Sequence, residues 1–264
     1  KVRADVLLFE KGLVDSREKA KRLIMEGSVF IGTQRVDKPG EKFDEDVEIY
    51  IKGNPIKYVS RGGLKLEKAM EKFNIDLNDN ITMDIGASTG GFTDCMLQNK
   101  ARKVFAVDVG YGQLDWKLRN HEDVVVMERT NIRNVTREDI IDIIDFISID
   151  VSFISLELVL PVAYDLLSDN GGVVALIKPQ FEAGKEKVGK NGIIRDKKVH
   201  VEVIEKVLKF SKELGFGIEG LDYSPITGAK GNIEFITYLK KGSEKNIDIK
   251  EIENIVDLAH LNLK

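Results

Sequence analysis

The residues with the clearest chemical meaning lie at 82–93, where the sequence reads Thr-Met-Asp-Ile-Gly-Ala-Ser-Thr-Gly-Gly-Phe-Thr. An apolar strand here leads directly into a glycine-rich turn and the start of a helix. Glycines let the backbone turn sharply and bring its amide groups against a ligand. The spacing matches neither Gly-x-Gly-x-x-Gly nor a phosphate loop that ends in Gly-Lys-Ser/Thr. The stretch predicts a site for a small nucleotide-like cofactor, with a purely structural turn as the alternative.

A second acidic residue supports the cofactor interpretation. Asp108 ends the apolar segment Val104–Asp108, about twenty residues after the glycine turn. A carboxylate in this place can accept hydrogen bonds from both hydroxyls of a ribose, and its alternative role is to cap a helix. Together with the acidic residue before the turn, it is typical of S-adenosylmethionine (SAM) sites. The predicted cofactor-binding residues are Asp84, Gly86, Ser88, Gly90, Gly91, Phe92, Asp108 and Asp150, with Asn131 and Ile132 beside the adenine.

Charged residues also end two later apolar strands. Asp150 ends the strand predicted at 145–150, and Lys178 ends the one predicted at 172–178. Burying a charge costs several kcal/mol unless a partner compensates it. We therefore expect Lys178 to lie near a carboxylate or to emerge into an active-site cleft. The alternative is a solvated lysine that merely caps its strand.

The order of elements predicts how these residues are positioned. Strands alternate with helices, which predicts a doubly wound, mainly parallel α/β sheet with its ligand outside the carboxyl ends of the strands. The last two strands are predicted to form an antiparallel hairpin, and residues 242–264 are predicted to end in a helix. The strands are predicted at 81–85, 103–107, 124–127, 145–150, 172–178, 216–222 and 233–239, and the clearest helices at 92–98, 156–167 and 197–214.

Bulk composition narrows the class of protein. The chain has 264 residues, a hydrophobic content of 42% and a formal charge of −4. It holds no apolar run of the roughly 20 residues that a membrane helix needs, and no secretory signal precedes the first helix. The single cysteine, Cys95, excludes an internal disulfide and a zinc cluster of cysteines. A cytoplasmic protein without a metal is therefore expected, and a local basic face can still bind nucleic acid.

The first 52 residues predict a separate small module of two helices and short antiparallel strands. Ser16 is a good N-cap, and Gly12 and Gly27 stand where the two helices end. The order Arg3-x-Asp5, Gly12-Leu13, Ser16-Arg17, Ala20, Leu23-Ile24, Gly27-x-Val29 resembles the S4 domain, a module that binds RNA. The alternative is a basic helix face that is only solvated. The predicted RNA-binding residues are Arg3, Arg17, Lys19, Lys21 and Arg22, with Arg61 beyond the module.

Over residues 3 to about 240, the chain resembles the TlyA family, also called haemolysin A, of S4-domain rRNA 2′-O-methyltransferases. Their catalytic domain is of the FtsJ/RrmJ type, a Rossmann-like SAM-dependent methyltransferase with a seven-stranded sheet. The resemblance implies a catalytic Lys-Asp-Lys-Glu tetrad, whose matching positions are Lys65, Asp150, Lys178 and Glu234. The family's connector motif Arg-x-Trp-Val falls on residues 56–59, where only Val59 and the aromatic Tyr58 fit. A signalling role for that connector is therefore in doubt.

The tetrad has a physical rationale. A ribose 2′-hydroxyl is a poor nucleophile, whereas the sulfonium methyl of SAM is already activated, so the enzyme must align the two groups and manage one proton. Lys178, with Asp150 beside it, could accept this proton or stabilise the developing alkoxide, and both roles remain open. Lys65 and Glu234 would orient the ribose and balance the charge. The reaction needs no metal.

The resemblance also implies the organisation and partners of the chain. We expect an S4-like domain at 1–54, a linker at 55–59, a methyltransferase domain at 60–241 and a C-terminal extension at 242–264. The implied substrate is rRNA or a ribosomal subunit, with a cytidine of 23S rRNA as the target and 16S rRNA as a further candidate. A monomer is the default, and no membrane partner is expected. The alternatives are a non-catalytic ribosome-assembly factor, a membrane-active haemolysin and a small-molecule methyltransferase.

Overall fold

The protein divides into two compact units, Lys1–Lys57 and Tyr58–Lys264. The structure is a computed structural model that describes residues 1–14, 16–32, 34–52, 57–189 and 192–263. Residues 55 and 56 of the predicted linker lie outside the described residues. Each unit has a hydrophobic core of its own.

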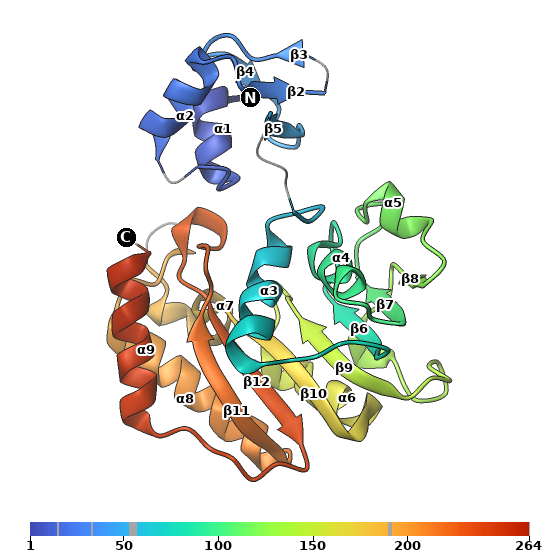
Figure 1. Ribbon diagram of the computed structural model, residues 1–264. Coiled ribbons are helices and arrows are strands. Elements are labelled where there is room, and N and C mark those ends of the chain that lie inside the picture. The colour runs from blue at the N-terminus through green and yellow to red at the C-terminus, as the bar shows by residue number, and fades with distance from the viewer. Residues whose placement is uncertain (15, 33, 53–56, 190–191, 264) are drawn as a thin grey trace. The chain divides into compact units, whose positions relative to one another are not determined.

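The N-terminal unit packs two helices against short strands, as Figure 1 shows. Ser16 begins the second helix, because its side chain accepts a hydrogen bond from the backbone N–H of Lys19 at 3.3 Å. Gly27, with φ +73°, then turns the chain away. The elements are β1 (Val2–Arg3), α1 (Ala4–Glu10), α2 (Arg17–Met25), β2 (Val29–Ile31), β3 (Gln34–Arg35), β4 (Lys42–Phe43) and β5 (Ile49–Ile51). The sheets are β1-β4 and β3-β2-β5.

The second unit is built on a sheet whose seven described strands run in the order β11-β12-β10-β9-β6-β7-β8 (Figure 1). The five strands from β10 to β8 are parallel, and β12 is antiparallel to both of its neighbours. The strands are β6 (Ile81–Ile85), β7 (Lys103–Val107), β8 (Val124–Met127), β9 (Ile144–Ile149), β10 (Leu167–Ile177), β11 (Phe216–Tyr223) and β12 (Phe235–Lys241). The predicted doubly wound, mainly parallel sheet with a final hairpin is confirmed.

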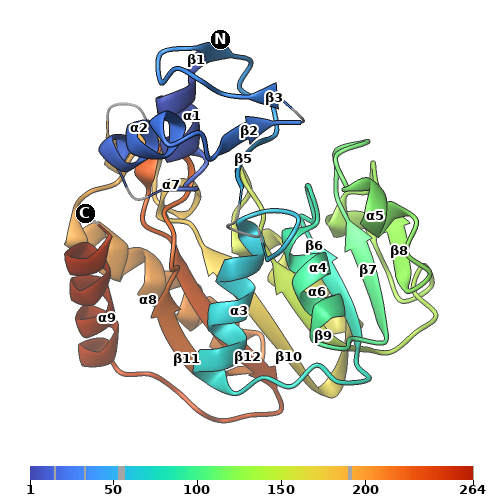
Figure 2. The same cartoon turned by 45° about the horizontal axis from the view of Figure 1, so that its top comes forward.

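Helices cover both faces of this sheet (Figures 1 and 2). Side chains alternate along a strand, so Phe146 and Val174 pack with α3 (Gly62–Phe73) and α4 (Gly91–Gln98), whereas Ile147 and Ala175 pack on the opposite face. The opposite face carries α6 (Leu160–Leu166), α8 (Lys197–Glu213) and α9 (Ile249–Asn262). The predicted C-terminal helix is thus α9.

The strand register determines which residues can meet at one edge of the sheet. Ile85 pairs with Ile149 across β6 and β9, and Ile149 pairs with Ala175 across β9 and β10. The segments that follow these parallel strands therefore leave the sheet side by side. Because β12 is antiparallel, it enters the sheet at this same edge, with Phe235 opposite Ile177. One edge thus gathers residues from four strands that are distant in the sequence.

We predict that Phe146→Ala destabilises the protein by about 3–5 kcal/mol, because the ring is 2% exposed and its loss leaves a cavity in the sheet core. The melting temperature should fall by about 10 °C, measured by thermal unfolding of the full chain. Ile141→Ala is the matched control, because Ile141 is 97% exposed, and it should change stability by less than about 0.5 kcal/mol. Equal effects of the two changes would contradict the assignment of Phe146 to the core.

Candidate active site

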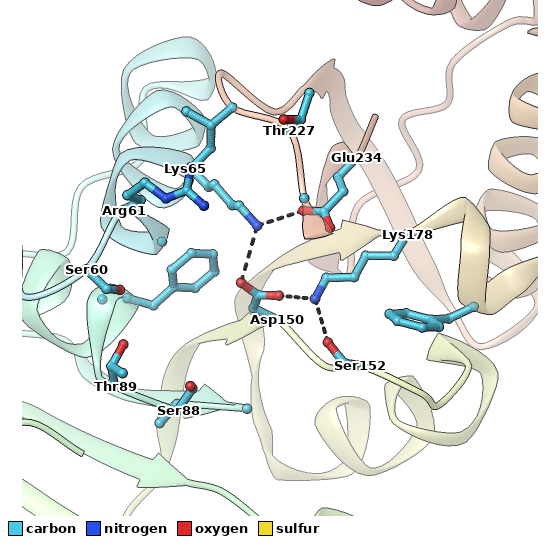
Figure 3. Close-up of a pocket in the computed structure, with 18 of the residues that line it drawn as sticks. Ser60, Arg61, Lys65, Ser88, Thr89, Asp150, Ser152, Lys178, Thr227 and Glu234 are labelled. Atoms are coloured by element: carbon cyan, nitrogen blue, oxygen red, sulfur yellow. Dashed lines mark hydrogen bonds and ion pairs between the residues drawn. The ribbon is translucent and has the colours of Figure 1, made fainter. Parts of the chain in front are cut away.

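A cavity of about 400 Å³ opens at this edge of the sheet. Its walls come from the segment before α3, the turn after β6, the segments after β9 and β10, and the hairpin before β12 (Figure 3). The lining residues are Ser60, Arg61, Gly62, Lys65, Gly86, Ala87, Ser88, Thr89, Gly91, Phe92, Asp150, Ser152, Phe153, Lys178, Gln180, Phe181, Ile226, Thr227, Gly228 and Glu234. All four predicted catalytic residues are among them.

These four side chains form a continuous chain of ion pairs, which Figure 3 draws as dashed lines. Lys65 Nζ donates to Glu234 Oε2 at 2.6 Å and lies 3.7 Å from Asp150 Oδ2. Lys178 Nζ lies 2.6 Å from Asp150 Oδ1 and donates to Ser152 Oγ at 3.0 Å. Asp150 therefore bridges the two ammonium groups.

Burial and neighbouring charges shift the pKa values of Lys65 and Asp150 in opposite directions. Lys65, Lys178 and Glu234 are each less than 10% exposed. Burial alone would lower the pKa of Lys65, but the Asp150 and Glu234 carboxylates outweigh it and hold this pKa above its ordinary value. Burial would likewise raise the pKa of Asp150, yet the two ammonium groups keep it below its ordinary value. Both groups are thus charged at neutral pH.

Asp84 anchors the glycine turn from within the protein. Its side chain is fully buried. Asp84 Oδ2 accepts hydrogen bonds from the backbone N–H of Thr93 at 2.9 Å and from Thr93 Oγ1 at 2.7 Å, and Asp84 Oδ1 accepts one from Ser148 Oγ at 3.2 Å. These bonds join β6 to the first turn of α4 and to β9. Asp84 does not line the cavity, so it supports the turn rather than facing a ligand.

The glycines of this turn are required by packing as well as by backbone conformation. Gly86 has φ +86°, and a Cβ at this position would clash with the carbonyl oxygen of Asp150. A Cβ at Gly90, with φ +98°, would clash with Leu118, and one at Gly91 would clash with Ser60. These glycines therefore allow close packing within the protein, and Gly86 and Gly91 also line the cavity.

Four other predicted cofactor residues lie outside the cavity lining: Gly90, Asp108, Asn131 and Ile132. Asp108 follows β7 and accepts hydrogen bonds from the backbone N–H groups of Ser88 and Gly110, both at 2.7 Å. Asn131 is exposed and caps the 3₁₀ helix η1 (Ile132–Asn134), whereas Ile132 is buried in the core. Ser88 and Phe92, in contrast, do line the cavity.

The predicted RNA-binding residues of the N-terminal unit make local ion pairs. Arg3 and Arg17 both bind Asp5, whose side chain is fully buried, at 2.9 Å. Arg17 therefore joins α2 to α1, and Arg3 ties the end of β1 to the start of α1, in addition to any contact with RNA. On α2, Lys21 pairs with Glu18 at 2.8 Å, and the exposed pair of Arg22 and Glu26 is 3.8 Å apart. Lys19 is exposed, and Arg61 lines the cavity of the second unit.

Comparison with known families shows what these two units are. The FtsJ-like methyltransferase model matches residues 58–241, and the S4 domain model matches residues 2–49. The chain belongs to the FtsJ-like methyltransferase family. The predicted family, fold class and enzyme class are confirmed.

Three proteins resemble this methyltransferase over nearly their full length. YqxC of Bacillus subtilis, described as a candidate rRNA methyltransferase, is 55% identical over 100% of this chain and 96% of its own. TlyA of Mycobacterium tuberculosis, named a 16S/23S rRNA (cytidine-2'-O)-methyltransferase, is 38% identical over 98% of this chain and 97% of its own. A solved structure from Streptococcus thermophilus, named as a hemolysin candidate, is 51% identical with a TM-score of 0.86 and covers 99% of this chain and 96% of its own.

The methyltransferase site also contains residues that sequence reasoning missed. Ser152 accepts a hydrogen bond from Lys178, and its place two residues after Asp150 was the signal that could have revealed it. Gln180 lines the cavity, and its buried Oε1 has no hydrogen-bond partner within the described part of the chain. Gly228 packs over Glu234, whose carboxylate would clash with a Cβ there.

Among the residues that the structure describes, no group of three or more His, Cys, Asp or Glu side chains could hold a metal ion. None of the helices formed by these residues has the length and apolar character to span a membrane.

Asp84 gives the methyltransferase a testable dependence on pH. Burial raises the pKa of Asp84 to about 7, against hydrogen bonds from Thr93 and Ser148 that lower it. Because this pKa exceeds the ordinary value of 3.8, the folded protein binds the proton of Asp84 more tightly than the unfolded chain does. The protonated carboxyl therefore stabilises the folded state fully below about pH 4, and this stabilisation is lost as pH rises through 7. The asparagine side chain of Asp84→Asn cannot ionise, but its oxygen can still accept a hydrogen bond from Thr93. The melting temperature of the wild type should therefore fall more between pH 5 and 8 than that of Asp84→Asn.

Parallel curves for the two proteins would show that Asp84 does not titrate in this range. Glu182, whose pKa burial raises, is common to both proteins, so its contribution cancels in the comparison.

Proposed function

We propose that this protein transfers a methyl group from SAM to a ribose 2′-hydroxyl of rRNA in the cytoplasm. The observation that carries the proposal is the convergence of Lys65, Asp150, Lys178 and Glu234 on one cavity beside the glycine turn. Its substrate in this proposal is a cytidine of 23S rRNA, with 16S rRNA as a second substrate. The activity for which the M. tuberculosis relative is named supports this choice.

The cavity residues fit SAM. One wall consists of the turn that contains Gly86, Ser88 and Gly91, and cavities of this size hold small cofactors. The buried Gln180 Oε1 is an acceptor for which a ligand can supply the donor. Each Asp108 oxygen accepts one backbone N–H, which leaves capacity to accept a ribose hydroxyl as well. When bound, SAM supplies an activated methyl group.

The geometry favours one of the two roles that the sequence left open for Lys178. Its ammonium group engages Asp150 and Ser152, which uses two of its three N–H donors. The third donor can bind the oxygen of the ribose. We assign Lys178 the stabilisation of the negative charge that develops on the ribose oxygen as this oxygen attacks the methyl group and its proton passes to solvent water. Asp150 holds the Lys178 ammonium group in place, and the Lys65–Glu234 pair positions the ribose from the other side.

Support for an RNA substrate comes from the N-terminal unit. Its match to the S4 domain model accompanies exposed basic side chains on α2, among them Lys19 and Arg22. The phosphate backbone of RNA is bound by such cations. In this proposal, Arg3 and Arg17 contribute to RNA binding with the parts of their side chains that Asp5 leaves exposed.

Incubation of the purified protein with labelled SAM and with ribosomal subunits that lack the modification tests the proposal. Mapping of the label should place it on a ribose 2′-oxygen of a cytidine. Label on a base, or only on protein, would overturn it.

Replacement of Lys178 separates the enzyme from a non-catalytic assembly factor. Lys178→Ala should lower kcat for methyl transfer by about 10²- to 10⁴-fold, because the developing charge loses its stabilising group. Binding of SAM and of rRNA should remain, as measured by calorimetry and filter binding. Lys212→Ala is the matched control, because Lys212 lies exposed on α8, and it should behave as the wild type. Unchanged methyl transfer by Lys178→Ala would remove Lys178 from the mechanism.

A further inference from the structure

The sheet fixes the backbone of Lys178 but does not orient its ammonium group. Lys178 directly follows β10, whose last residue, Ile177, pairs with Phe235 of β12. The charge of a lysine lies at the end of a flexible four-carbon stem, and its three N–H groups rotate about the last bond. The ion pair with Asp150 at 2.6 Å holds Nζ in place without setting the direction of every N–H. That direction requires a second fixed partner.

Ser152 is this second partner. Its Oγ lines the cavity and accepts a hydrogen bond from Lys178 Nζ at 3.0 Å (Figure 3). The N–H bonds of an ammonium group point to the corners of a tetrahedron, so two occupied directions determine the third. With Asp150 and Ser152 both bound, Lys178 therefore presents one N–H in one direction to a substrate oxygen.

Ser152 itself is not held by the sheet, because it lies three residues beyond the end of β9. The segment that carries it is fixed at its start, where the backbone N–H of Asp150 donates to the carbonyl oxygen of Ile85 at 3.0 Å. Phe153 then turns the chain with φ +64°. The position of Ser152 thus depends on how the far end of this segment is fixed.

Glu182 fixes that far end. Its Oε2 accepts a hydrogen bond from Ser155 Oγ at 2.7 Å, and its Oε1 accepts one from the backbone N–H of Leu156 at 2.8 Å. The Glu182 side chain is buried and does not line the cavity. Burial of a carboxylate is costly unless its oxygens are bonded, and here both oxygens bond to one neighbouring segment. Glu182 therefore ties the segment after β9 to the segment after β10.

We propose that Ser152 is a positioning residue that directs the third N–H of Lys178 at the ribose oxygen, and that Glu182 holds Ser152 in place for this task. The inference rests on the proposed function, because it assumes that Lys178 acts on a ribose oxygen. Such orientation matters for rate, since a misplacement of about 1 Å can cost about 100-fold. Both residues act through Lys178.

Single-turnover methylation of unmodified ribosomal subunits tests the role of Ser152. Ser152→Ala should lower the rate constant about 10- to 100-fold, because Lys178 loses the partner that orients it. Ser152→Thr should stay within about threefold of the wild type, because it keeps a hydroxyl acceptor. The affinities for SAM and for the subunits should not change. Weaker binding of subunits with an unchanged rate constant would overturn the inference, because Ser152 would then bind the substrate itself.

A double-mutant cycle separates positioning from a general effect on stability. In the Lys178→Ala background, Ser152→Ala should cause no further loss of rate, because no ammonium group remains to be oriented. The same loss in both backgrounds would contradict the inference. Ser168→Ala is the matched control, because Ser168 lies near the start of β10, at the end of the strand away from the cavity, and it should behave as the wild type.

Glu182→Ala tests the second half of the proposal. The rate constant should fall about tenfold while the amplitude of the single turnover, which counts active molecules, stays that of the wild type. Glu182→Gln should keep most of the rate, because its amide can bond to both Leu156 and Ser155. A lower amplitude with an unchanged rate constant would show that Glu182 only stabilises the fold.

Ser155→Ala decides the question if Glu182→Ala does not fold. It removes one of the two hydrogen bonds of Glu182 and should lower the rate constant about threefold, and no change would overturn the role of Glu182. Failure of the proposed function gives a different result from all of these outcomes. In that case the wild type itself methylates no ribose.

Discussion

The Asp150 carboxylate is the interaction on which the site depends. It accepts Lys178 on one oxygen and lies near Lys65 on the other, so one buried anion holds two buried cations together. Without it, two ammonium groups would face each other in a cleft of low polarity, where repulsion is strong. The backbone of Asp150 is fixed as well. The N–H of Asp150 donates to the carbonyl oxygen of Ile85 at 3.0 Å, and Gly86 packs against the carbonyl oxygen of Asp150.

The sheet explains why this arrangement is possible. Parallel strands deliver Gly86, Asp150 and Lys178 to one edge, and the antiparallel β12 returns Glu234 to the same edge. Lys65 arrives from the first turn of α3, which packs on the sheet through Leu66 and Met70. Each of the other three catalytic residues lies one residue beyond the end of a strand, so the packed sheet fixes its position.

Much of this was predictable from the sequence, because hydrophobic periodicity reflects local structure. The strands at 81–85, 103–107 and 124–127 agree with the structure to the residue. The places that sequence could not resolve depend on tertiary contacts. Ile132 has the position expected of an adenine neighbour but lies in the core, and Arg3 and Arg17 converge on Asp5 from separate elements. Lys65 and Glu234, 169 residues apart, became candidates only through resemblance to a family.

The place of β12 has a consequence for synthesis of the protein. Although β12 is made after β11, it lies between β10 and β11, so the growing sheet cannot be completed in the order of translation. When the N-terminal unit has left the ribosome, its basic side chains are already present, whereas Glu234 is still to be made. The tetrad therefore cannot assemble until residue 234 has also left the ribosome.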